Sequence, residues 1–265
     1  MVKEIEAKVA KVFGEDDASS STQTTAAPQG TPEAPDRARA AQEQGFFDWE
    51  CVDVIQQTRK GEVKISHDEE CKKFFPDKFA KLKPSFDREN GTLTAANSTP
   101  LTDGASSVLL ASEEWAKARG LPILAYLTPY SRTAAVDYVD GGEGLLMSPT
   151  YAVADMLDAA GLTLQDFDFY EIHEAFAAQV LCTLKAWESK KYCEEKLGRS
   201  EPLGSIDTTK LNVKGSSLAA GHPFAATGAR ILANAAKLLN EKGSGRCLIS
   251  ICAAGGQGVV AIVEK

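Results

Sequence analysis

The end of the chain carries the pattern that most constrains its fold. Residues 247–251 and 259–263 are two short apolar runs, and the sequence between them is Cys-Ala-Ala-Gly-Gly-Gln-Gly. Short apolar runs that are bounded by glycines and contain Ile and Val are typical of β-strands. The sequence therefore predicts that the chain closes with a pair of strands joined by a glycine-rich turn.

Upstream of this pair, apolar runs alternate with helical patterns. Strands are predicted at 92–94, 105–111, 123–127 and 167–172, and helices at 112–119, 148–160, 174–193 and 222–241. Ser148 and Pro149 are typical of a helix start, whereas Gly161 and Gly243 are typical of positions just after a helix end. Strands that alternate with helices and finish in a strand pair predict an α/β fold with helical layers around a mixed sheet.

The first ninety residues lack this regularity. Apolar residues at helical spacing predict a short helix over 2–13, and residues 14–44 form a polar arm rich in Ser, Thr, Ala and Pro, with a helix over 37–44. Residues 45–90 mix aromatic and charged residues, which favours a small loop-rich layer packed on a larger body. His67 is interpreted as a solvated loop residue because Ser66 and Asp68 flank it.

Composition excludes several classes of partner and site. The net charge is −8 and the acidic residues are spread along the chain, so neither nucleic acid nor an anionic membrane is expected to bind. No apolar run approaches the roughly 18 residues that span a bilayer, and no apolar signal-peptide core is recognisable at the start. The six cysteines form no CxxC pair, which favours reduced thiols in a reducing compartment and predicts neither a disulfide framework nor a metal site.

A histidine stands in an unusual loop near the end of the chain. His222 follows Gly221, precedes Pro223 and lies among small residues that let another backbone or a ligand come close. A capping or core histidine is the alternative interpretation of such a residue. The chain has three histidines in all, so this placement is informative.

Four turns in the chain carry chemically useful side chains, and each is predicted at the end of a strand or the start of a helix. They are Asn97-Ser98, His173-Glu174-Ala175-Phe176, Gly221-His222-Pro223 and the turn from Cys252 to Gly258. As a set and in this order they resemble the thiolase family, most of all the β-subunit type of the fatty-acid oxidation trifunctional enzyme. The resemblance extends over roughly 38–265.

The resemblance implies a role for each residue in thiolase chemistry, which uses a nucleophilic cysteine, a base, an acid/base cysteine and oxyanion holes. His222 would be the base that activates the nucleophilic thiol, and Cys252 the acid/base cysteine. His173 and Asn97 would position the water or the thioester oxygen. The Ala254 backbone N–H would belong to an oxyanion hole, while Gly221, Gly255, Gly256 and Ser98 would approach the substrate or CoA. CoA thioesters are then substrates, and no tightly bound cofactor is implied.

Thiolases carry their nucleophilic cysteine in an N-terminal half that this sequence is expected to lack for the most part. The expected fold is a layered α/β/α thiolase fold with a complete C-terminal domain at 121–265. Residues 91–120 would be a remnant of the N-terminal domain, 45–90 a remnant of the loop domain, and 1–44 a helix with a disordered arm. The predicted strand at 105–111 would have an unpaired edge, so the chain is expected to need a partner.

Two functions are compatible with these features. In the first, the chain is one half of a split thiolase that converts 3-ketoacyl-CoA and CoA into acyl-CoA and acetyl-CoA, with an N-terminal thiolase half supplied by another chain. In the second, it is an inactive thiolase-like subunit of a larger assembly. The resemblance implies the mitochondrial matrix as its location, and the cytoplasm is the alternative.

Overall fold

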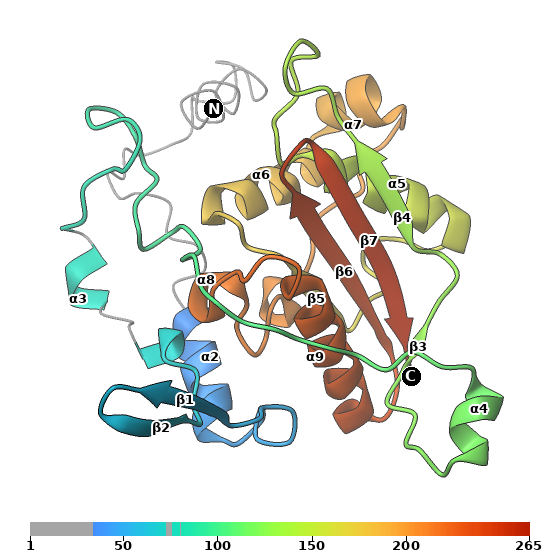
Figure 1. Cartoon of the computed structure of the whole chain (residues 1–265). Helices are drawn as coiled ribbons and strands as arrows, with labels where there is room; N and C mark the ends of the chain where they lie inside the picture. The colour runs from blue at the N-terminus through green and yellow to red at the C-terminus, as the bar shows by residue number, and fades with distance from the viewer. Residues whose placement is uncertain (1–33, 73–75, 80) are drawn as a thin grey trace.

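The computed structural model describes residues 34–72, 76–79 and 81–265 (Figure 1). Its centre is a mixed sheet in which strands β3 (Tyr126–Leu127), β7 (Gln257–Glu264), β6 (Arg246–Ala253) and β5 (Phe169–Ile172) are neighbours in this order. Strand β4 (Arg132–Ala135) also pairs with β7. Strands β5 and β6 are parallel, and the other pairs are antiparallel. The predicted mixed sheet and closing strand pair are confirmed.

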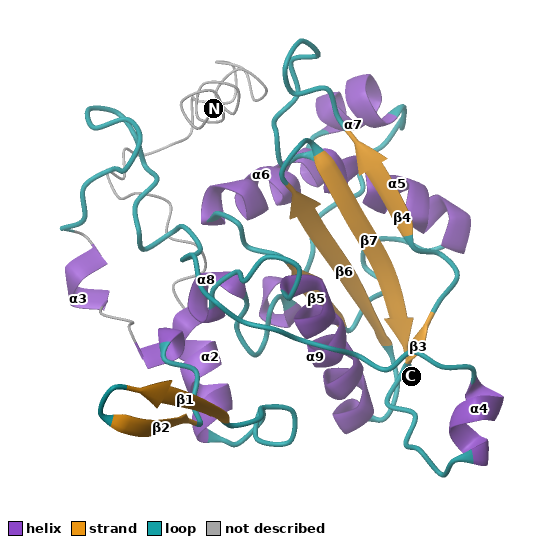
Figure 2. Cartoon of the chain, in the orientation of Figure 1, coloured by secondary structure: helices purple, strands orange, loops and turns teal. Residues whose placement is uncertain are grey.

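Helices cover both faces of this sheet, because alternate residues of a strand point to opposite faces. Leu248, Val260 and Ile262 pack with helices α5 (Ser148–Ala160) and α6 (Ala177–Glu188). Cys247, Ile249 and Val263 pack on the other face with helix α9 (Thr227–Lys242). Figure 2 shows the strands between these helices. The layered α/β/α arrangement is thus built from the alternation within β6 and β7.

The helices differ from the prediction in three details. Helix α5 ends at Gly161 in the left-handed conformation, as predicted, but its N-cap is Met147 rather than Ser148. The helix predicted over 174–193 is two helices, α6 and α7 (Lys190–Leu197), because Ser189 is extended and its hydroxyl caps α7. Helix α9 begins at Thr227 rather than at 222, and a separate turn, α8 (Ser217–Ala220), precedes it.

Two predicted strands between 91 and 111 are absent. Residues 92–94 form a loop that is buried at Leu93, and residues 105–111 are exposed and irregular. A run of apolar residues becomes a strand only when it finds a pairing partner, and within the described residues no strand pairs with 105–111. Helix α4 (Glu113–Ala118) follows as predicted, capped by Ser112. The strand predicted over 123–127 shortens to β3.

The described residues before 72 include a segment that lies beside α8 and α9 (Figure 1). The predicted helix over 2–13 and most of the polar arm lie outside the described residues. The end of the arm forms helix α2 (Ala34–Glu43), which buries Ala38 and Ala41 and so packs as part of the body. Strands β1 (Val54–Thr58) and β2 (Gly61–Ile65) form an exposed hairpin. The remaining short turns are η2 (Glu70–Lys72), α3 (Pro76–Phe79) and η3 (Thr208–Lys210).

Candidate active site

Two of the four predicted turns follow the parallel ends of β5 and β6. The register pairs Ile172 with Ser250, and the His173 backbone N–H continues the ladder to the Ser250 carbonyl at 2.9 Å. His173, directly after β5, and Cys252, near the end of β6, therefore lie at the same edge of the sheet. This edge, where parallel strands end in an α/β fold, is where ligand sites form.

The segment that contains Asn97 connects this edge to the His222 loop. The Thr99 backbone N–H donates to the Ala175 carbonyl at 3.1 Å, and the Thr99 hydroxyl donates to the Ser217 carbonyl at 2.7 Å. The His222 backbone N–H donates to the Pro100 carbonyl at 3.3 Å. All four turns that were singled out in the sequence thus meet in one place.

The two histidines lie against one another. The ring centroids of His173 and His222 are 4.3 Å apart and the planes are tilted by 42°. His173 is 1% exposed, and burial, together with neighbouring His222 and Arg230, lowers its pKa to about 3. Burial and then Arg230 also lower the pKa of the half-buried His222. Both rings are therefore held in the neutral form, in which one nitrogen donates and the other accepts.

Cys252 lies at the end of β6 in a closed apolar environment. Its thiol packs with Leu145 and Leu146 and is 5% exposed. Burial raises its pKa to about 12, and hydrogen bonding from the backbone N–H groups of Cys252 itself and Ala175 opposes this shift. The sulfur is thus protonated at neutral pH, a state suited to giving a proton to a developing carbanion.

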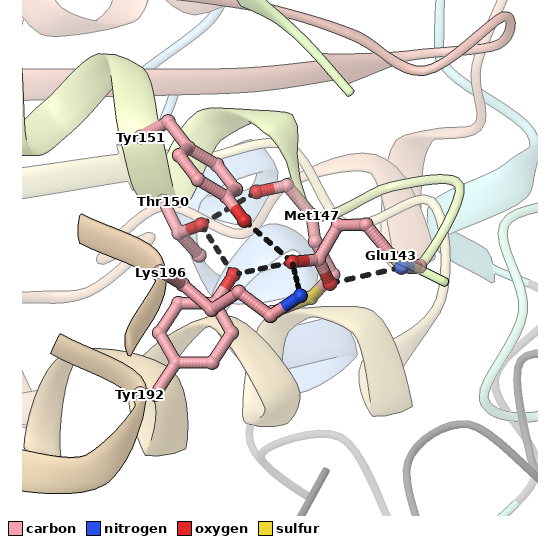
Figure 3. A network of polar contacts seen from close by, with 7 residues as sticks. Glu143, Met147, Thr150, Tyr151, Tyr192 and Lys196 are labelled. Carbon is pink, nitrogen blue, oxygen red and sulfur yellow. Dashed lines mark hydrogen bonds and ion pairs between the residues drawn. The ribbon is translucent and has the colours of Figure 1, made fainter. Parts of the chain in front are cut away.

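A buried carboxylate, Glu143, anchors the start of the loop that covers this cysteine, and Figure 3 shows the polar contacts around that carboxylate. Glu143 accepts hydrogen bonds from the hydroxyls of Tyr151 at 2.6 Å and Tyr192 at 3.2 Å, and from the Gly144 backbone at 2.9 Å. Lys196 lies 3.9 Å from the same carboxylate. These bonds fix the start of the loop two residues before the leucines that pack on Cys252.

A second buried anchor joins the two histidine turns. Asn212 accepts from the Ile172 backbone N–H and donates to the Ile172 carbonyl, both at 2.9 Å. Its amide also donates to Glu174 at 2.9 Å, and Glu174 accepts from the Leu218 backbone N–H at 3.2 Å. Sequence reasoning did not assign these roles. For Glu174 a signal was present, because it lies next to His173 in one of the four turns.

The structure gives Asn97 a local role that the sequence did not reveal. Its side chain accepts from the Thr94 backbone N–H at 2.8 Å and donates to the Thr92 carbonyl at 2.9 Å, so both ends of the amide hold their own turn. Ser98 lies opposite Phe176 in an isolated bridge. A direct role of Asn97 or Ser98 at the substrate stays a prediction.

The glycines divide into two kinds. Gly221 and Gly256 have φ values of +82° and +73°, and a side chain there would meet Thr102 or the Val136 carbonyl oxygen at 2.5 Å. At these two positions the absence of a side chain lets another segment of the protein pack against the glycine backbone. Gly255 faces open space and Ala254 is exposed in the same turn, which leaves this backbone accessible for the predicted oxyanion and CoA contacts.

The remaining cysteines occupy other places. Cys51 is exposed, whereas Cys71, Cys182, Cys193 and Cys247 are buried. Among the described residues, no group of three or more potential ligands is arranged to hold a metal ion. In the same parts of the chain, no helix is both long and apolar enough to cross a bilayer. The site therefore offers two neutral imidazoles, a protonated thiol and an open glycine turn.

Comparison with known proteins agrees with this site. Residues 121–265 match the family described as thiolase, C-terminal domain, and residues 33–114 match thiolase, N-terminal domain. A partial N-terminal domain is therefore present and begins earlier than the expected remnant at 91–120.

Individual relatives match over much of the chain. The 3-ketoacyl-CoA thiolase of Shewanella sp. (strain W3-18-1) is 50% identical over 188 residues, which are 71% of this chain and 42% of the relative. That of Pseudoalteromonas atlantica is 52% identical over 186 residues, 70% of this chain and 42% of the relative. The chain thus spans less than half the length of these curated relatives.

Solved structures show the same fold. The acetyl-CoA acetyltransferase of Bacillus anthracis aligns with a TM-score of 0.77 and 31% identity, over 98% of this chain and 59% of that one. Human mitochondrial 3-ketoacyl-CoA thiolase aligns with a TM-score of 0.73 and 25% identity, over 99% of this chain and 59% of that one. With two histidines and a protonated cysteine gathered at the end of a mixed sheet, and a C-terminal domain match over more than half its length, the chain belongs to the thiolase family.

Proposed function

We propose that this chain supplies the base and the acid/base cysteine of an acyl-transfer site, which converts 3-ketoacyl-CoA and CoA into acyl-CoA and acetyl-CoA. The observation that carries the proposal is the meeting of His222, His173 and Cys252 at one sheet edge. The nucleophilic cysteine is contributed by a second chain that contains the N-terminal half of a thiolase.

The proposed reaction has two halves. His222 takes the proton from the nucleophilic thiol, and the thiolate attacks the keto carbon of the substrate. The bond between the α and β carbons breaks, and the acetyl-CoA carbanion takes the proton of Cys252. The incoming CoA thiol then gives its proton to the Cys252 thiolate and attacks the acyl-enzyme. The leaving cysteine thiolate recovers its proton from His222, which restores both groups.

An exposed apolar segment supports the need for a second chain. Val108, Leu109 and Leu110 are 36%, 71% and 64% exposed, and Leu101 nearby in the sequence is 82% exposed. Consecutive apolar residues at this exposure are unusual for a surface that faces only water. The same segment runs beside the site, since the Ser106 hydroxyl donates to the Ala226 carbonyl. A chain that pairs with residues 105–111 would reach the histidines.

An inactive subunit is the second candidate, and the cysteines favour it. Cys252 packs with Ala175 and Phe176, next to His173 in the chain. Four other cysteines are buried elsewhere, in other clusters or against backbone carbonyls, and none of these four packs in the cluster of Cys252: Cys71, Cys182, Cys193 and Cys247. In this alternative the chain packs in a larger assembly without turnover.

Complementation separates the two candidates. The full chain is co-expressed with a separate chain that carries the N-terminal half of a family thiolase, and thiolysis of a 3-ketoacyl-CoA is measured on the purified complex. Turnover that is lost in His222→Ala and Cys252→Ser supports the enzyme. A stable complex in which His222→Ala changes nothing, or in which no turnover occurs, supports the inactive subunit. Arg132→Ala, which changes a partly exposed residue of β4 outside the four turns, is the matched control.

The proposed location is the mitochondrial matrix, on the resemblance to the trifunctional-enzyme β-subunit type. Fractionation of cells that express the tagged full chain tests it, since recovery with cytoplasmic markers would contradict this location.

A further inference from the structure

Two hydroxyl groups contact the two histidines of the site. Ser217 Oγ lies 2.7 Å from His173 Nδ1, and Thr227 Oγ1 lies 2.6 Å from His222 Nδ1. A hydroxyl has one hydrogen to donate, whereas its oxygen can also accept. The second partner of each hydroxyl therefore decides whether it donates to its histidine or accepts from it.

For Ser217 the second partner is a donor. Arg230 Nη2 lies 2.9 Å from Ser217 Oγ, and a guanidinium has no acceptor. The Ser217 oxygen therefore accepts from Arg230, and among the described residues His173 Nδ1 is the acceptor found for its hydrogen. Because Ser217 is fully buried, bulk water does not compete for that hydrogen. His173 then accepts at Nδ1 and carries its own proton on Nε2.

For Thr227 the second partner is an acceptor. Its hydroxyl donates to the Pro223 carbonyl, four residues earlier, at 3.4 Å. The side chain of a threonine can bond to the carbonyl three or four residues before it. With its hydrogen directed there, Thr227 Oγ1 accepts from His222 Nδ1–H. His222 Nε2 is then left with a free lone pair.

We propose that Ser217 and Thr227 are positioning residues that hold the two imidazoles in opposite neutral tautomers, with His173 Nε2 as a hydrogen-bond donor and His222 Nε2 as an acceptor. Burial lowers the pKa of both rings, so neither becomes charged near neutral pH. What the tautomers do in catalysis rests on the proposed function. The unprotonated Nε2 of His222 can take the proton of a thiol, and the Nε2–H of His173 can donate to a thioester oxygen.

Ring-nitrogen NMR tests the tautomers on the full chain without any turnover. Bare and protonated imidazole nitrogens resonate far apart, and His173→Gln and His222→Gln assign the signals. The wild-type chain should show a bare Nδ1 with a protonated Nε2 for His173, and the reverse for His222. The same tautomer in both rings, or the two exchanged, would overturn the proposal.

Substitutions then test the causes. Ser217→Ala should move both His173 nitrogens toward averaged shifts, and Ser217→Thr, which keeps the hydroxyl, should restore the wild-type pattern. Thr227→Val should do the same to His222. Ser216→Ala is the matched control, because Ser216 is buried and its hydroxyl has no hydrogen-bond partner among the described residues. Unchanged His173 shifts in a folded Ser217→Ala variant would refute the role of Ser217.

Turnover in the complemented complex supplies a separate readout. Loss of one oxyanion donor lowers kcat by about 10²–10³-fold in other enzymes. A ring that keeps its place but samples the wrong tautomer should lower kcat by at least about tenfold, with a smaller change in KM. If the tautomers are as proposed but no complex turns over, the proposed function fails and the tautomer assignment stands.

Discussion

Removal of the Asn212 side chain should destabilise the fold more than any other single polar truncation near the site. Asn212 is 2% exposed and binds both backbone groups of Ile172 and the Glu174 carboxylate. Asn212→Ala would leave two buried backbone groups and a carboxylate oxygen without these partners, and each such group costs about 1–3 kcal/mol. Its φ is +46°, where alanine costs about 1–2 kcal/mol more.

The three hydrogen bonds share one side chain, so their contributions overlap and the sum is an upper bound. We expect the free energy of unfolding to fall by about 4 kcal/mol. Asn212→Gly removes the same bonds without the left-handed strain, so its loss should be about 1 kcal/mol smaller. The comparison separates hydrogen bonding from backbone strain.

Urea denaturation followed by far-UV circular dichroism measures these differences. Asn234→Ala is the matched control, because Asn234 is buried in α9 while its Oδ1 has no partner among the described residues. Its loss should stay below about 1.5 kcal/mol. A loss below about 1 kcal/mol for Asn212→Ala, or a glycine variant no milder than the alanine variant, would refute the reasoning.

Three further outcomes follow from the structure. Gly256→Ala should lower the thermal midpoint far more than Gly161→Ala. Both glycines have positive φ, but only at Gly256 would the new Cβ meet a carbonyl oxygen, at 2.5 Å. Equal midpoints of the two variants would contradict this packing. Burial raises the Glu171 pKa to about 8, so between the pKa of the unfolded chain and pH 8 the native state binds one proton more than the unfolded state. The free energy of unfolding should therefore fall as the pH rises through this range, by at most about 1.4 kcal/mol per pH unit. Glu171→Gln should flatten this slope in denaturation at a series of pH values, and an unchanged slope would exclude Glu171 as its source. Finally, mass spectrometry after brief iodoacetamide treatment should find Cys51, which is exposed, alkylated. Cys252 should stay unmodified, because it is buried and burial raises its pKa to about 12. Similar alkylation rates for the two cysteines would show that Cys252 is accessible to the reagent.

The elements that were predicted well are those whose pattern is local. Strands β6 and β7 carry apolar runs and the glycine turn between them, and α9 stops at Gly243, which adopts the left-handed conformation that ends helices. The break between α6 and α7 was not predicted, because the helical pattern continues through Ser189, which ends α6 and caps α7. Residues 105–111 were wrongly predicted as a strand, because a strand requires a neighbour that sequence pattern does not supply.

The candidate site shows the same division. The sequence by itself determined which side chains belong to it, because His173, His222 and Cys252 stand in motifs that are specific as a set. Only the tertiary structure decided how they are held, since Ser217 is 44 residues from His173 in the chain yet 2.7 Å from its ring. The direction of each hydrogen bond depends on the second partner of each hydroxyl, Arg230 or a carbonyl. The Thr227 contacts are local in the chain, whereas the contact between Ser217 and His173 is made by packing between distant segments, which residue spacing does not encode.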